Sequence, residues 1–191
     1  LLRAAVLASD GYLEEADTSA VKGEEIIARG RPIEQAILLA GLEAGFAERP
    51  LRLASPRVDE LSFSSVRRFG GMLVKDEGKH VAYLTGAPEL FLEHAVRAMG
   101  GRGGAAPFTK EDHTLFEDAL MRAAREGKRV IAVAKVDADF KAFPEETELE
   151  GMLRSLELLG FIVFSDVIRS DARASVHEMQ EAGARVIMLT G

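Results

Sequence analysis

Apolar residues with helical spacing mark three stretches of the chain. They cover residues 1–8 and 32–45, and the second stretch opens with Pro32, which suits the first position of a helix. A third stretch follows Thr109, which begins a capping-box pattern, and ends at Gly127. We therefore predict a helix over each of these stretches.

Strands are predicted where the spacing changes to period two, over residues 57–74, and Phe63 ends the first apolar run there. Residues 76–79 have the composition of a hairpin turn, and residues 80–84 form the returning strand. A further strand with an apolar centre is expected over residues 128–135. Together these strands predict an antiparallel sheet.

The returning strand runs into a helix over residues 88–99 through Thr85, Gly86 and Ala87. A glycine here allows a tight turn or the close approach of a ligand, and the first amides of the helix are free to face it. An ordinary strand-to-helix connection is the alternative interpretation. The glycine-rich run 100–104 follows a helix rather than a strand, so we interpret it as a linker and not as a phosphate loop.

The last forty residues have a different pattern. A continuous apolar run over residues 158–164 is typical of a strand buried on both faces, as in a parallel sheet. A helix over residues 171–182 and a second buried strand over residues 185–189 would complete a βαβ unit. The acidic segment 137–150 is expected to be a surface loop, with room for a short helix.

Composition narrows the class of protein. With 47% hydrophobic residues the 191-residue chain can form a globular core, and its net charge of -7 argues against nucleic acid or an anionic membrane as a partner. There is no cysteine, and the four histidines lack metal-ligand spacing, so we expect no metal site. No apolar run approaches the roughly 18 residues of a membrane span, which predicts no direct membrane contact.

Several motifs, taken in order, resemble those of the P-type ATPases, the ATP-driven cation pumps. Residues 30–36 resemble Gly-x-Pro-x-Glu-x-Ala, residues 63–68 resemble Phe-Ser-Ser-x-Arg-Lys, and residues 85–89 resemble Lys-Gly-Ala-Pro-Glu. Residues 128–134 are similar to the arginine-bearing strand of that family, and residues 159–191 to the return of the chain into its phosphorylation domain. Each motif is weak alone, but five in the right order and spacing are a strong signal.

The resemblance implies an α/β (α+β) fold. Residues 1–153 would be the nucleotide-binding domain, an antiparallel sheet flanked by helices, and residues 154–191 the truncated start of the phosphorylation domain, a partial βαβ of a haloacid-dehalogenase-like parallel sheet. The chain would then be a cytoplasmic domain of an integral membrane pump. Its partners would be ATP or ADP, with Mg²⁺ accompanying the nucleotide in the parent protein, and the remaining phosphorylation, actuator and transmembrane domains.

Site residues follow from the same resemblance. Phe63 would stack on adenine, and Glu34 would accept a hydrogen bond from the adenine amino group. Arg68 and Arg129 would contact the phosphates, which suits the planar guanidinium group. The junction formed by Thr85, Gly86 and Ala87 would belong to the nucleotide site, and support of the phosphorylation site would come from Asp166, Arg169, Thr190 and Gly191.

Ordinary structural roles compete with these assignments. Without the resemblance, Phe63 would be interpreted as a core aromatic residue on a strand, and Glu34 as an acid that complements the dipole of its helix. Arg68 and Arg129 would be solvated surface charges.

Two residues depart from the family pattern. Thr85 stands where the family has lysine, so a cation beside the nucleotide is missing, and Val167 stands where proline is usual. The sequence also lacks the Asp-Lys-Thr-Gly-Thr motif that supplies the phosphorylated aspartate and the Gly-Asp-Gly-x-Asn-Asp loop for magnesium. The parent would be an ATP hydrolase and cation translocase, and this chain alone is expected to be catalytically inactive. The ligands of the transported ion would lie on membrane helices.

Two other classes of protein remain open. One is a soluble phosphatase of the haloacid-dehalogenase type with residues 1–153 as its cap, although the Asp-x-Asp strand that it needs is missing. The other is a non-catalytic interaction module, in which the resemblance at the adenine pocket would be coincidental. Titration with ATP and with a phosphosugar would separate the three.

Overall fold

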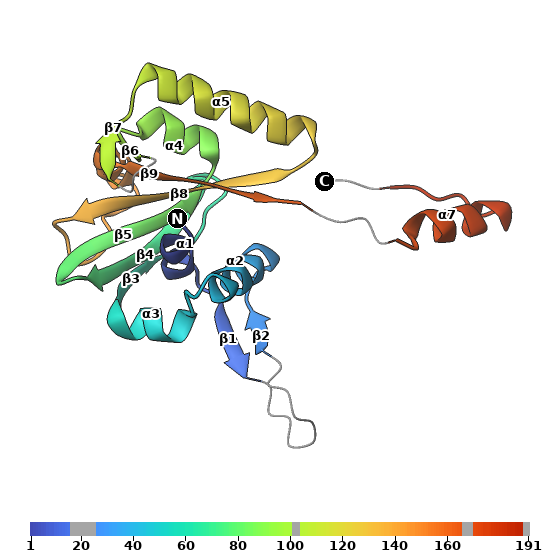
Figure 1. The fold of residues 1–191 in the computed structure, drawn as a ribbon, viewed down its shortest axis with the longest axis horizontal. Helices are drawn as coiled ribbons and strands as arrows, with labels where there is room; N and C mark the ends of the chain where they lie inside the picture. The colour runs from blue at the N-terminus through green and yellow to red at the C-terminus, as the bar shows by residue number, and fades with distance from the viewer. Residues whose placement is uncertain (16–25, 101–103, 166–169, 189–191) are drawn as a thin grey trace.

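The computed structural model describes residues 1–15, 26–100, 104–165 and 170–188 (Figure 1). A seven-stranded sheet has the order β3-β4-β5-β8-β9-β6-β7, and a two-stranded sheet pairs β1 with β2. The strands are β1 (Tyr12–Glu15), β2 (Ile26–Arg29), β3 (Arg57–Leu61), β4 (Phe69–Asp76), β5 (Lys79–Gly86), β6 (Arg97–Met99), β7 (Ala105–Pro107), β8 (Arg129–Ala138) and β9 (Glu157–Phe164). The helices are α1 (Leu2–Ala8), α2 (Pro32–Glu43), α3 (Glu48–Ala54), α4 (Pro88–His94), α5 (Lys110–Arg125), α6 (Leu149–Met152), a 3-10 turn (Leu153–Ser155) and α7 (Ala172–Glu181).

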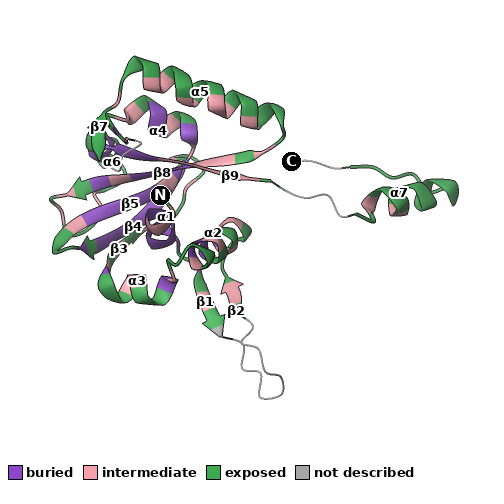
Figure 2. Ribbon diagram, viewed as in Figure 1, coloured by how far each residue is buried: buried purple, intermediate pink, exposed green. Residues whose placement is uncertain are grey.

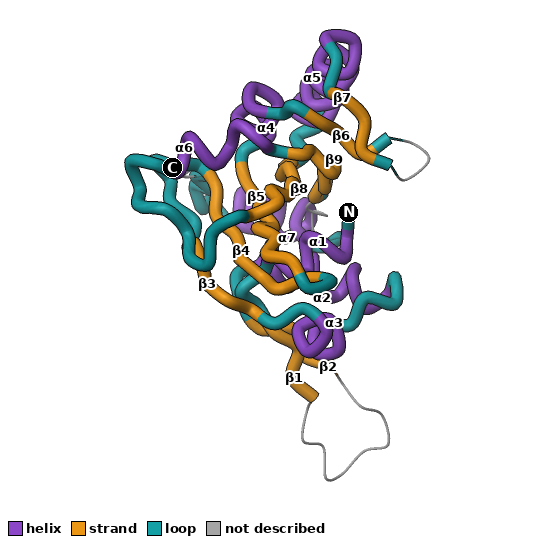
Figure 3. Tube along the Cα trace, turned by 90° about the vertical axis from the view of Figure 1, so that its left-hand side faces the viewer, coloured by secondary structure: helices purple, strands orange, loops and turns teal. Residues whose placement is uncertain are grey.

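Helices cover both faces of the large sheet (Figures 1 and 3). On one face α1 packs against β4, β5 and β8, with α2 and α3 beside it, and α4, α5 and α6 lie on the other face. The alternation of side chains along β5 serves both faces, because Val81 and Tyr83 join the cluster under α1 whereas Ala82 and Leu84 join the cluster under α4. Figure 2 shows the buried strand centres between helices whose outer surfaces are exposed.

The expected antiparallel sheet flanked by helices is confirmed. The hairpin between β4 and β5 turns at Glu77 and Gly78, whose φ angles of 49° and 81° both fit the left-handed turn of a tight hairpin. The capping box of α5 also forms, because the Asp112 amide donates to Thr109 Oγ1 at 3.2 Å and the Thr109 amide donates to Asp112 Oδ2 at 2.9 Å.

The predicted helix over residues 88–99 is wrong in its second half. α4 ends at His94, and residues 97–99 form β6, which pairs with β9 on one side and β7 on the other. The spacing of the apolar residues there is compatible with a helix or a strand. Pairing with β7 and β9 favours the strand. The hairpin of β1 and β2 and the short helix α3 were not predicted, because polar residues and Pro50 obscure their periodicity.

The last apolar run is a strand, but its predicted parallel setting is largely wrong. β9 pairs antiparallel with β8 from Glu157 to Phe164 and lies parallel to β6 for only two residues. A central strand in an antiparallel sheet gives the same apolar run as a parallel one, because helices cover both faces here too. β9 therefore extends the same sheet as β3, β4, β5 and β8.

The predicted second strand of the βαβ unit does not form over residues 185–188, which are exposed. A buried strand needs a neighbouring strand, and none of the described strands pairs with this segment. Helix α7 confirms the helix expected over residues 171–182, and it lies beyond the end of β9 with no buried residue (Figure 1). The domain boundary after residue 153 stays a prediction.

Candidate functional site

The strands carrying the predicted site residues meet at one end of the large sheet. β5 ends at Gly86 beside the first residue of β4, Phe69, and Gly86 also lies opposite Ala132 of β8. β8 begins three residues earlier, at Arg129. Because these strands are antiparallel, the end of β5 and the beginnings of β4 and β8 share this edge. We call this edge the open end, defined by Phe63, Arg68, Thr85, Gly86 and Arg129.

Side-chain alternation places several of these residues on one face of the sheet. Thr85 follows Tyr83 by two positions, and Arg129 precedes Ile131 by two, so both lie on the face covered by α1 and α2. Glu34 reaches this face from the first turn of α2. Glu34, Thr85 and Arg129 thus belong to the same face of the sheet.

Phe63 lies just beyond the end of β3 and not on a strand, and half of its surface is exposed (50%). Its backbone crosses Gly70 of β4, where an added Cβ would lie 2.7 Å from the Phe63 nitrogen, so only glycine fits. Gly70 pairs with Thr85, which sets the Phe63 segment beside that residue. The interpretation of Phe63 as a core aromatic residue on a strand is therefore wrong.

Three arginines near the open end have different surroundings. The Arg67 guanidinium donates to the carbonyls of Ser62 and Phe69, forms an ion pair with Glu146 and lies 5.4 Å from the centre of the Phe69 ring. Arg68 and Arg129 are exposed, and within the described ranges neither has an ion pair or side-chain hydrogen bond. Arg67 thus fastens the loop that carries Phe63, while Arg68 and Arg129 are available to an anion.

Glu34 is buried (8% exposed) at the third position of α2. Its Oε2 accepts the Arg31 amide at 2.8 Å, and its Oε1 accepts Nε and Nη2 of the Arg31 guanidinium at 3.1 and 2.6 Å. Burial raises the pKa of Glu34, but the hydrogen bonds from Arg31 more than offset this and hold the pKa below its usual value. Arg31 was not among the predicted site residues, because its only signal in the sequence is an opposite charge three residues before Glu34.

The junction after β5 is more tightly packed than expected. A Cβ on Gly86 would lie 2.6 Å from Phe69 Cβ and 2.8 Å from the Arg68 carbonyl, so this glycine permits close contact between strands. The Ala87 amide donates to the same Arg68 carbonyl at 2.9 Å. Arg68 itself has a φ of 64°, which this contact helps to maintain. Thr85 is half-buried at the base of the open end.

Four predicted residues, Asp166, Arg169, Thr190 and Gly191, lie outside the described residues. Within the described part, no group of three or more metal-ligating side chains is present. No helix in that part has the length and apolar character needed to cross a membrane.

The chain is similar in sequence to known proteins. The family described as "P-type ATPase, cytoplasmic domain N" matches residues 1–171, most of the chain. The chain therefore belongs to the P-type ATPase family. It is 29% identical over 168 residues to a calcium-transporting ATPase of Bacillus subtilis, an alignment that covers 87% of this chain and 18% of the relative.

Other relatives have similar coverage. A probable cation-transporting ATPase F of Mycobacterium tuberculosis is 31% identical over 162 residues, 85% of this chain and 17% of the relative. The human sodium/potassium-transporting ATPase subunit alpha-2 is 27% identical over 151 residues, 75% of this chain and 15% of the relative. The N domain thus spans less than a fifth of the length of these curated relatives. The family match favours the pump over the soluble phosphatase and the interaction module.

Proposed function

We propose that this N domain binds ATP at the open end, with the adenine beside Phe63 and Glu34 and the phosphates toward Arg68 and Arg129. The observation that carries the proposal is the combination, at one sheet edge, of a half-exposed aromatic ring and two exposed guanidinium groups that have no side-chain partner among the described residues. Base stacking on an aromatic side chain contributes about 1 to 3 kcal/mol, and planar guanidinium groups suit phosphate oxygens.

In the proposed role the bound nucleotide presents its γ-phosphate to an aspartate outside this chain. The remaining phosphorylation, actuator and transmembrane domains of the pump would be the partners, and Asp166, Arg169, Thr190 and Gly191 would support the phosphorylation site. Mg²⁺ would accompany the nucleotide in the parent protein. The chain alone would bind ATP without hydrolysing it, because the aspartate that receives the phosphate is missing from its sequence.

Isothermal titration of the chain with ATP, with and without a chelator, tests the proposal. We expect weak binding that does not require magnesium, because the residues at the open end contact base and phosphate rather than metal. The same samples should release no inorganic phosphate over hours. Heat of dilution alone at millimolar ATP would contradict the proposed function.

A further inference from the structure

Arg31 occupies a position that the motif Gly-x-Pro-x-Glu-x-Ala leaves unspecified, and it contacts the carboxylate assigned to adenine. We propose that Arg31 is a positioning residue that fixes Glu34 with one acceptor left free, and that it thereby sets the preference for adenine over guanine. This inference rests on the proposed ATP-binding function and concerns the choice of base at that same site.

The hydrogen bonds of Glu34 define how much of its carboxylate remains available. A carboxylate offers about four acceptor positions, two on each oxygen. The Arg31 side chain takes two at Oε1, with distances of 3.1 and 2.6 Å, and the Arg31 amide takes one at Oε2. Counting only donors from the part of the chain that the structure describes, one acceptor position is left, on Oε2.

Two glycines keep the carboxylate in this place. A Cβ on Gly30 would lie 2.8 Å from Glu34 Oε2, and the Gly30 φ of 127° also favours glycine. A Cβ on Gly11, which lies just before β1, would be 3.2 Å from Glu34 Cβ. The carboxylate therefore lies against bare backbone on one side and the Arg31 guanidinium on the other.

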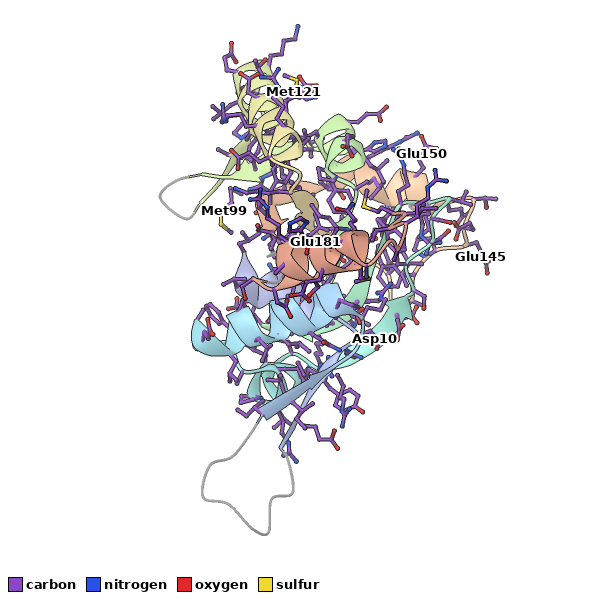
Figure 4. The ribbon with its side chains drawn as sticks, turned by 90° about the vertical axis from the view of Figure 1, so that its right-hand side faces the viewer. Asp10, Met99, Met121, Glu145, Glu150 and Glu181 are labelled. Carbon is purple, nitrogen blue, oxygen red and sulfur yellow. The ribbon has the colours of Figure 1, made fainter. Side chains whose placement is uncertain are left out.

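Three other charges act on this pair, two from β3 and one from the segment before β1. Arg57 of β3 acts on Glu34, whereas Asp10, before β1, and Glu60 of β3 act on Arg31. Figure 4 shows Asp10 where the β1–β2 hairpin meets α2. Without the Arg31 side chain, the pKa of Glu34 should rise, because burial still acts on the carboxylate while the hydrogen bonds from the Arg31 guanidinium, the main influence that lowers the pKa, are lost.

The protonation state of Glu34 decides which base it can bind. Adenine carries an amino donor at its 6-position, whereas guanine carries a carbonyl acceptor there, which an ionised carboxylate repels. A protonated carboxyl group has one O–H donor and can bind that carbonyl. Losing Arg31 should therefore weaken the choice of adenine most at acidic pH.

The test is isothermal titration of ATP and of GTP into the whole chain at several pH values between about 5 and 7.5. The two nucleotides share the same triphosphate, so its titration cancels in the ratio of their dissociation constants. For the unchanged protein we expect a constant preference for ATP. For Arg31→Ala we expect ATP to bind more weakly and the preference to fall by about threefold to tenfold toward pH 5. Arg31→Lys should keep part of the preference for ATP that Arg31→Ala loses.

Arg29→Ala is the matched control, because Arg29 lies two residues away and forms an exposed ion pair with Glu14. It removes the same charge and should leave the preference unchanged. Glu34→Gln should lower the preference by itself, and adding Arg31→Ala to it should cause no further loss, since Arg31 acts through Glu34. If Arg31→Ala does not fold, Arg31→Gln, which keeps a donor but no charge, should show the same pH-dependent loss.

An unchanged ATP preference in the folded Arg31 variants at every pH would overturn the inference and leave the proposed function intact. Equal losses with and without Glu34→Gln would also overturn it, because Arg31 would then act by another route. No binding of either nucleotide to the unchanged protein would instead overturn the proposed function, and the inference with it.

Discussion

The two ends of the β4–β5 hairpin differ in how their charged groups are satisfied. At the turn end, Asp76 accepts two hydrogen bonds from the Arg3 guanidinium at 2.9 and 2.7 Å, one from Ser55 Oγ at 2.7 Å and one from the Tyr83 hydroxyl at 2.6 Å. At the open end, Arg68 is exposed and has no side-chain partner within the described ranges. The same pair of strands thus has a closed end, where the buried carboxylate is fully bonded, and an open end, where Arg68 has no partner among the described side chains.

The difference separates residues that stabilise the fold from residues that are free to bind. The Arg3 guanidinium holds the pKa of Asp76 well below its usual range, despite burial, and Tyr83 and Ser55 lower that pKa further. These bonds join α1 to the hairpin and to the segment after α3. A perturbed pKa can indicate a functional site, but here every acceptor position of the carboxylate has a protein donor, which indicates a structural network.

Removing the Asp76 carboxylate at the closed end should have the largest effect of the changes considered, a loss of stability. Asp76→Ala removes the carboxylate that accepts from both Arg3 and Tyr83 and leaves the Arg3 charge without its ion-pair partner, so we expect a loss of about 2 to 4 kcal/mol in the free energy of unfolding. Urea denaturation measures it, with Asp137→Ala, an exposed carboxylate on β8, as the control of equal charge. Binding of ATP by the folded variant should be unchanged. A large fall in affinity would show that the two ends are not independent.

Removing the aromatic ring of the open end should lower the affinity for ATP and leave the stability nearly unchanged, the opposite of the result expected for Asp76→Ala. Phe63→Ala is expected to weaken the binding of ATP and ADP equally, by about 1 to 3 kcal/mol, since stacking involves only the base that they share. Its stability should change little because the ring is half exposed. Phe46→Ala, a partly exposed phenylalanine after α2, is the control. If Phe63→Ala instead unfolds the domain and leaves the affinity unchanged, the ring has a structural role.

Protonating Asp76 should lower the free energy of unfolding less than removing its carboxylate does, because a neutral Asp76 still accepts some hydrogen bonds. A lowered folded-state pKa gives stability that is complete above the unfolded-state pKa of about 3.9 and is lost as the pH falls below it. Burial raises the pKa of Tyr83 to about 12, so its contribution is present below about pH 10 and is lost as the pH rises toward 12.

The free energy of unfolding should therefore be nearly constant between about pH 5 and pH 9 and should fall on both sides. Urea denaturation as a function of pH measures this. Asp76→Asn should flatten the acid side of the curve, and an acid side identical to that of the unchanged protein would contradict the role of Asp76.

The smallest effect is expected at Thr85, where the family has lysine. Thr85→Lys should tighten ATP binding by up to about 1 kcal/mol, with a gain that shrinks as salt is raised. Arg67 is already bonded to Ser62, Phe69 and Glu146. Dissociation constants at low and high salt decide the matter. Unchanged values at both would exclude Thr85 from the pocket.

Much of the fold could be predicted from local patterns. Pro32 and the spacing after it predicted α2, and the positive φ angles at Glu77 and Gly78 agree with the predicted turn. β6 and the orientation of β9 could not be predicted, because they depend on which strands lie beside them. A three-residue strand has no period of its own, and a buried apolar run does not indicate the direction of its neighbours.

The candidate site was predictable mainly through the resemblance. Periodicity placed Phe63 on a strand, whereas Gly70 allows its segment to cross β4 in a loop. Arg31 and Glu34 show why spacing alone is insufficient. An i,i+3 pair of opposite charges is ordinarily a weak surface interaction, and only the burial of Glu34 distinguishes this one.

An NMR titration of the ¹⁵N-labelled chain with ATP shows which end of the hairpin binds the nucleotide, because it reports on both ends at once. Binding at the open end predicts the largest shifts for the amides of Phe63, Gly70, Thr85, Gly86 and Arg129, with little change from Asp76 to Lys79. Shifts concentrated at the turn end, or none at millimolar ATP, would contradict the assignment of nucleotide binding to the open end.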